Sequence, residues 1–109
     1  RDLYMVTSSS QAELLWFIEV DLGTESGGAI GRKCRTYHDY WTTGTEQHQI
    51  GVFPKVLWTT PSERRREFLQ RTIAGLRTVE RDLFAVTTTN KAVEVLAGGE
   101  TVDFSGGRP

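Results

Sequence analysis

The alternation of apolar and polar positions along the chain predicts four β-strands. Residues 3–7 and 14–21 are apolar and β-prone, and the Ser-rich stretch between them predicts a turn, so the two segments should form a hairpin. The second segment is apolar on both faces until its last residues, which is typical of a central strand covered on both sides. Two more strands are predicted at residues 52–59 and 83–87.

Between these strands the hydrophobic period changes to that of helices. The first predicted helix has a buried stripe at helical spacing, formed by Ile30, Cys34, Tyr37 and Trp41. Thr24 or Ser26 can cap its start, and Gly44 lies where the helix should stop. A second helix is predicted from Thr60, as its N-cap, to about Arg77, and a short third helix from Asn90, as its N-cap, through Leu96.

This order, β-β-α-β-α-β-α, predicts an α/β fold with a mixed central sheet flanked by helices on both faces. A chain of 109 residues leaves room for one domain, which we place at residues 1–97, followed by a flexible Gly-rich tail at 98–109. The chain opens directly on a strand-like segment, so we expect it to be a fragment of a longer protein.

The composition limits which partners and which cellular compartment are expected for this domain. The net charge is −1, so any attraction to nucleic acid must come from a local patch. Cys34 is the single cysteine, which excludes an internal disulfide and indicates a reducing compartment; we expect a soluble, cytoplasmic protein. No apolar run approaches the roughly 20 residues that span a bilayer, so no membrane partner is expected.

The strongest chemical signal is a group of carboxylates at the end of the second strand. Side chains alternate along a strand, so Glu19 and Asp21 project from the same face. Pairing of the first two strands as a hairpin would bring Asp2 beside them. Three such oxygen donors suit Mg²⁺ or Mn²⁺, which can activate water for attack on a phosphodiester. Lys33, about two turns into the next helix, could lean toward this group and pair with a carboxylate or a phosphate.

A purely structural interpretation of the same residues stays open. Asp21 could accept backbone N–H bonds from the turn at Gly23 and Thr24, and Glu19 could form a structural salt bridge with Lys33.

Arginine residues provide a second candidate surface. The predicted second helix and its exit hold a concentration of them: Arg64, Arg65, Arg66, Arg71, Arg77 and Arg81. Arg64, Arg65 and Arg71, with Arg32 and Arg35 beside Lys33, are candidate DNA contacts. A solvated helix face with ion pairs four residues apart is the alternative.

The run Tyr37-His38-Asp39-Tyr40 suggests a tyrosine nucleophile of the relaxase type. However, the chain has no His-x-His pair that would hold the metal of such an enzyme, and Tyr37 falls on the buried stripe. A role for Tyr37 in the core is therefore favoured.

Several of these residues together resemble the replication-relaxation family of bacterial plasmid and mobile-element proteins. The resemblance spans about residues 2–77 and depends on the run Trp16 to Ser26, which contains Glu-x-Asp-x-Gly-Thr-Glu-Ser, on Lys33, Tyr37 and Tyr40, and on the run Phe53 to Trp58. It implies a part in plasmid or mobile-element replication and DNA relaxation. DNA, and other replication proteins of the element, are the partners it implies.

The same residues are similar to restriction-endonuclease-like nucleases, whose pattern is Pro-Asp followed by (Asp/Glu)-x-Lys. The similarity implies that Asp2 and Glu19 fill the two acidic places and that the carbonyl of Val20 completes a metal shell. Arg1 replaces the proline, and Asp21 stands where the lysine belongs, so Lys33 would take the role of a lysine that has moved to the helix.

We therefore expect a metal-dependent nuclease-like domain that acts on DNA. Under this hypothesis Asp2, Glu19 and Asp21 bind Mg²⁺ or Mn²⁺, and Lys33 is the fourth catalytic residue. The alternative is a catalytically inactive, nuclease-derived module that binds DNA or docks a protein, and a purely structural oligomerisation domain is a third possibility. The sequence leaves open whether the site is active and which oligomer forms.

Overall fold

A four-stranded sheet forms the centre of the computed structural model, which describes residues 3–8, 13–50, 54–77 and 79–96. Its strands are β1 (Leu3–Ser8), β2 (Glu13–Val20), β3 (Lys55–Thr60) and β4 (Phe84–Thr88), in the spatial order β1-β2-β3-β4. β1 and β2 are antiparallel, with Leu3 opposite Ile18, while β2, β3 and β4 are parallel. The predicted hairpin and the mixed α/β class are confirmed.

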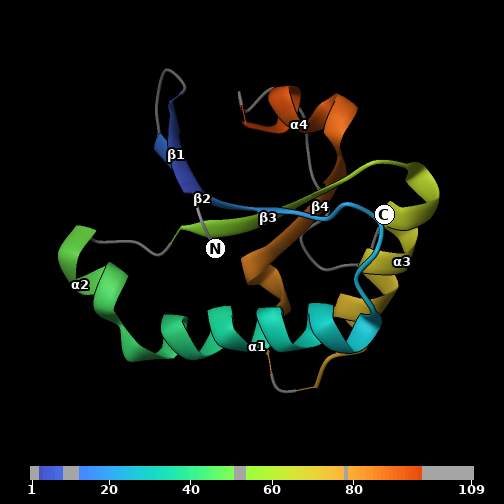
Figure 1. The fold of residues 1–109 in the computed structure, drawn as a ribbon. Helices are drawn as coiled ribbons and strands as arrows, with labels where there is room; N and C mark the ends of the chain where they lie inside the picture. The colour runs from blue at the N-terminus through green and yellow to red at the C-terminus, as the bar shows by residue number, and fades with distance from the viewer. Residues whose placement is uncertain (1–2, 9–12, 51–53, 78, 97–109) are drawn as a thin grey trace.

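Helices cover both faces of this sheet, as Figure 1 shows. They are α1 (Gly27–Thr43), α2 (Thr45–Ile50), α3 (Glu63–Ala74) and α4 (Thr89–Leu96), with a 3₁₀ turn, η1, at Arg81–Leu83. α1 and α3 lie against one face and α4 against the other, while α2 extends beyond the end of α1 (Figure 1). The sequence pattern did not predict α2, and the likeness to restriction endonucleases stays a prediction.

The two faces of the sheet hold separate hydrophobic clusters. On the larger one, β-strand residues pack against α1 and α3; its buried members include Phe17, Ile30, Cys34, Tyr37, Val56, Trp58, Leu69, Ile73, Phe84 and Val86. On the other face, Trp16, Leu57 and Ala85 pack against Val95 of α4. Neighbouring residues of β2 therefore point to opposite clusters, and this alternation places Glu19 and Asp21 on the α1 side together with Phe17.

Local capping sets the ends of the first long helix as predicted. The Ser26 hydroxyl accepts the backbone N–H of Ala29 at the start of α1. Gly44 ends α1 with a φ of 74°, a left-handed conformation that glycine adopts without steric cost. Trp41 is only half-buried, whereas the three other predicted stripe residues are fully buried.

The starts of the other two helices were predicted wrongly. Ser62, not Thr60, caps α3, because the Ser62 hydroxyl accepts the N–H of Arg65 while Thr60 is still the last residue of β3. α3 also ends at Ala74, before Arg77. α4 begins at Thr89, so Asn90 lies inside the helix and is not its cap.

Part of the predicted architecture lies outside the described residues. This applies to the turn at 9–12, the start of the predicted strand at 52–53, and the tail at 98–109. None of the helices in the described ranges is long and apolar enough to cross a membrane.

Candidate functional site

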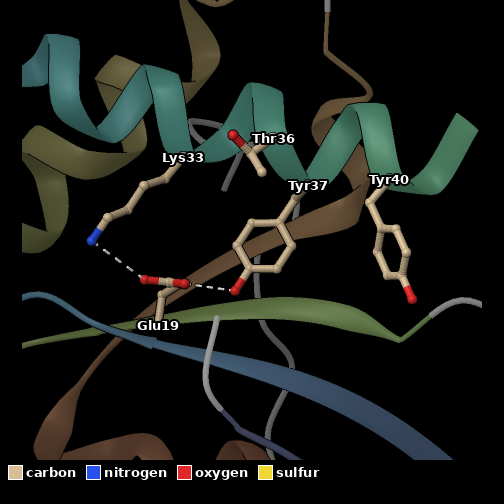
Figure 2. A pocket seen from close by; sticks show the side chains of 5 residues that line it. All are labelled: Glu19, Lys33, Thr36, Tyr37 and Tyr40. Atoms are coloured by element: carbon tan, nitrogen blue, oxygen red, sulfur yellow. Dashed lines mark hydrogen bonds and ion pairs between the residues drawn. The ribbon is translucent and has the colours of Figure 1, made fainter.

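Glu19 lies next to the last residue of β2, and its side chain is bonded from α1. Its exposed fraction is only 5%. The Tyr37 hydroxyl donates a hydrogen bond of 2.6 Å to one carboxylate oxygen, Oε2, and the Lys33 ammonium lies 3.7 Å from the other, Oε1 (Figure 2). Burial of an ionised carboxylate is costly unless donors or cations compensate it. Tyr37 and Lys33 supply that compensation.

Helical spacing brings these two partners together. Lys33 and Tyr37 are four residues apart on α1, so their side chains lie on the same face, the one directed at β2 (Figure 2). Tyr37 is 3% exposed, and its ring packs against Phe17 with centroids 5.6 Å apart. This packing orients the Tyr37 hydroxyl, which donates the hydrogen bond to Glu19.

Lys33 makes its shortest contact with a second carboxylate. Its ammonium is 2.6 Å from Oε2 of Glu25, which lies just before the N-cap of α1. The ammonium also lies 5.9 Å from the centre of the Trp58 ring, within cation–π range. The hydrogen bond to Glu25, with smaller attraction from Glu19, raises the pKa of Lys33 although partial burial opposes the shift. Lys33 is therefore a fixed cation at neutral pH.

A pocket of about 480 Å³ opens beside these groups. Glu19, Lys33, Thr36, Tyr37 and Tyr40 line it, and Figure 2 shows the side chains of Lys33, Tyr37 and Tyr40 reaching from α1 toward the sheet. The pocket thus combines one carboxylate, one ammonium and three hydroxyl groups, which is a donor and acceptor set for a polar, charged ligand.

Asp21 shares the face of Glu19 but has a closed environment. Its carboxylate accepts two bonds from the Arg65 guanidinium, at 2.7 and 3.0 Å. The Thr60 hydroxyl donates at 2.8 Å and the backbone N–H of Gly23 at 3.1 Å. Burial alone would raise the pKa of Asp21, but the bonds from Arg65, Thr60 and Gly23 outweigh it and lower the pKa.

The structural interpretation of both carboxylates therefore has direct geometric support. Asp21 accepts the N–H of Gly23 in the turn, and Glu19 pairs with Lys33. Asp2 lies outside the described residues. Among the residues that the structure describes, no group of three or more histidine, cysteine, aspartate or glutamate side chains is arranged to hold a metal ion.

The predicted DNA contacts divide into two groups. Arg32 and Arg35 on α1, and Arg64 and Arg71 on α3, are exposed. Arg65 instead reaches back to Asp21 and to the backbone carbonyl of Glu25, and its guanidinium lies 4.7 Å from the Phe68 ring centre.

Sequence reasoning missed two members of the site. Glu25 was part of the resembling run but was given no role, although it makes the shortest contact with Lys33. Tyr37 was taken as core, and it is both core and the hydrogen-bond donor of Glu19. The spacing of four residues between Lys33 and Tyr37 places both on one helix face, and this was the pattern in the sequence that could have indicated a role for Tyr37 beside Lys33.

Cys34 offers no second reactive centre. It is fully buried in the core, and burial raises the pKa of its thiol to about 12. A thiol in this state is neutral and inert as a nucleophile.

The fold and the site together define a mixed α/β domain with a buried carboxylate and a lysine at the end of a central parallel strand. The replication-relaxation family model matches residues 2–56, just over half of the chain, and the chain belongs to this family. Membership suggests a role in the replication of plasmids or mobile elements. No curated protein and no solved structure gave a match.

Proposed function

We propose that this domain is a metal-dependent nuclease-like module that acts on DNA phosphodiesters during plasmid or mobile-element replication. The observation that carries the proposal is the placement of buried Glu19 and cationic Lys33 together in one pocket at the end of β2. The carboxyl ends of parallel strands are where open α/β sheets form functional crevices. A carboxylate with a nearby cation can serve both a metal ion and a phosphate group.

The donor chemistry determines which residues would hold Mg²⁺ or Mn²⁺. Glu19 is the one carboxylate among the described residues that lines the pocket, so it would bring a hard oxygen ligand there, and the metal would have to share its oxygens with Tyr37 and Lys33. Asp21 fits poorly, because Arg65, Thr60 and Gly23 already bond its two oxygens. We retain Asp2 in the proposal. The described hairpin ends with Leu3 opposite Ile18, and Asp2 and Glu19 are the residues next to this pair in the two strands. A bound divalent ion would supply an activated water and would neutralise phosphate charge.

The remaining roles belong to side chains of the pocket. Because its pKa is raised, Lys33 stays protonated, so it would stabilise charge on the phosphate and would not act as a base. Tyr37 orients Glu19 through its hydroxyl. In the reaction, a water oxygen bonds to phosphorus, one ester P–O bond breaks, and the leaving oxygen takes up a proton. Exposed Arg32, Arg35, Arg64 and Arg71 would contact the DNA backbone.

Nicking of supercoiled plasmid in Mn²⁺ tests this proposal. We expect wild-type protein to convert supercoiled DNA to the open-circular form, and Glu19→Gln to lower that rate at least about 100-fold without unfolding the domain. Glu63→Gln is the matched control, because Glu63 is an exposed carboxylate whose partner is Arg66. Absence of nicking by the wild type with Mn²⁺, Mg²⁺ and other divalent ions would contradict the proposal.

A second function is favoured by the contacts that Glu19 already makes. Tyr37 donates a hydrogen bond to its carboxylate and Lys33 forms an ion pair with it, as expected in a nuclease-derived domain that has lost catalysis and binds DNA or a replication protein. In that case the domain should bind the plasmid without nicking it. Arg64→Glu with Arg71→Glu should then weaken binding and reduce its salt dependence, whereas Glu19→Gln should bind like the wild type.

A further inference from the structure

The polar groups that line the pocket differ in what they can offer a ligand. Among the described residues, the hydroxyl groups of the lining all donate their protons within the protein: Tyr37 to Glu19, Tyr40 to Glu46, and Thr36 to the backbone carbonyl of Arg32. A hydroxyl has one proton, so toward a ligand these groups would act as acceptors. The carboxylate of Glu19 also accepts. The described lining is therefore rich in acceptors and fits a ligand that donates hydrogen bonds.

Lys33 is the donor in this lining. Its ammonium carries three N–H groups, and Glu25 accepts from it at 2.6 Å. The Lys33 side chain is 42% exposed, so the ammonium can also donate to a ligand in the pocket. The ammonium lies 3.7 Å from Oε1 of Glu19 (Figure 2). A charged donor and a charged acceptor therefore lie side by side, and both form strong hydrogen bonds.

Tyrosine rings also line the pocket. Lys33, Tyr37 and Tyr40 follow the spacing i, i+4, i+7 on α1, so the cation and both rings lie on the helix face that is directed at the sheet (Figure 2). The Tyr40 ring is half-buried and packs on Phe17, with centroids 6.5 Å apart. Aromatic rings beside a donor and an acceptor suit a flat ligand that stacks and forms hydrogen bonds along one edge.

Among the DNA bases, guanine has the edge that matches this arrangement. Its Watson–Crick edge has two adjacent donors, N1–H and N2–H, next to the acceptor O6. A carboxylate can accept two adjacent donors at once, and an ammonium beside it can donate to O6. Adenine and cytosine each have one donor group on this edge, and thymine has one donor between two acceptors. Guanine alone among the four therefore engages both oxygens of Glu19 and the ammonium of Lys33.

We propose that this pocket binds an unpaired guanine base of single-stranded DNA, with Glu19 accepting from N1–H and N2–H and Lys33 donating to O6. The inference rests on the second function proposed above, in which the domain binds DNA without cutting it, and it requires no metal ion. The base must be unpaired, because a duplex already uses its Watson–Crick edge. The pocket volume of about 480 Å³ is within the range of roughly 300–1,000 Å³ that is usual for small-ligand sites.

Fluorescence anisotropy with the full chain in EDTA tests the proposal, because EDTA removes divalent ions and so prevents metal-dependent cleavage. The probes are a labelled oligothymidine and the same oligonucleotide with one central guanine. We expect the guanine probe to bind about tenfold more tightly, since a bidentate contact to one base discriminates by roughly that factor or more. Hypoxanthine lacks the N2 amino group, so its substitution for guanine should weaken binding at least about threefold.

Glu19→Gln separates recognition of the base from general affinity for DNA. The amide keeps one acceptor but turns a donor toward the donors of guanine, so this variant should bind both probes alike. It should bind the thymine probe as the wild type does, because phosphate contacts from exposed arginines do not involve Glu19, and this result also shows that the variant is folded. Glu63→Gln is the matched control and should keep the full preference for guanine, because Glu63 is an exposed carboxylate paired with Arg66.

The outcomes distinguish this inference from the function on which it depends. If the wild type binds neither probe at low salt, DNA binding fails and the guanine site fails with it. Equal binding of both probes by the wild type overturns the guanine site alone. A preference for guanine that persists in Glu19→Gln also overturns it, since another part of the protein would then recognise the base.

Discussion

Glu19 and Asp21 are two residues apart and lie on the same face of the sheet, yet their surroundings differ. Asp21 is 2% exposed, and its carboxylate is bonded by a guanidinium, a hydroxyl and a backbone N–H. Glu19 is nearly as buried, but it borders a pocket, accepts a hydrogen bond from Tyr37 and forms an ion pair with Lys33. Burial is therefore similar at the two positions, and access to a pocket is what separates them.

This comparison shows that a cluster of acids at a strand end need not act as a single site. A carboxylate whose oxygens accept a guanidinium fork and further donors contributes to the fold. Glu19, by contrast, lines a pocket beside Lys33, where a ligand in that pocket could reach it. The two are connected, because Arg65 links Asp21 to the backbone of Glu25, which in turn bonds Lys33.

The largest effect should come from replacing each carboxylate by its amide. Asp21→Asn should lower the free energy of unfolding by about 3 kcal/mol, because an amide group would face the donors of Arg65 and Thr60 in a buried site. Glu19→Gln should cost about 1 kcal/mol or less, since its carbonyl oxygen can still accept one of its two bonds. Urea unfolding of both variants measures the difference; equal losses would remove the distinction between the two residues.

A smaller effect should appear in how the free energy of unfolding depends on pH in acid. Folding lowers the pKa of Asp21 below its unfolded value of about 3.9, so its ionisation stabilises the fold fully above that value. This contribution is lost as the pH falls through the folded-state pKa. The stability difference between wild type and Asp21→Asn should therefore narrow below about pH 4. A constant difference down to pH 2 in urea titrations would contradict the assigned cause.

Local patterns in the sequence predicted much of this arrangement. Strand alternation placed Glu19 and Asp21 on one face, and helical spacing placed Lys33 near the strand end. The cap at Ser26 and the stop at Gly44 also follow from residue chemistry within one turn. These features depend on neighbours along the chain, which a single sequence displays directly.

Contacts between distant segments were not predictable in the same way. Arg65 was predicted as a DNA contact because it lies in an arginine-rich run, and its pairing with Asp21, 44 residues away in the chain, was not predicted. Thr60 was assigned as a helix cap because Pro61 follows it, but it ends β3 and donates to Asp21. Both assignments depended on local composition, whereas the observed partners come from strand and helix packing.

Anomalous diffraction from a crystal soaked in Mn²⁺ tests most directly whether Glu19, and not Asp21, is the carboxylate that binds the metal ion. The account predicts a manganese peak at the Glu19 carboxylate beside the pocket, with Asp21 still bonded to Arg65 and free of metal. A peak on Asp21, or no peak at Glu19 at saturating Mn²⁺, would contradict it.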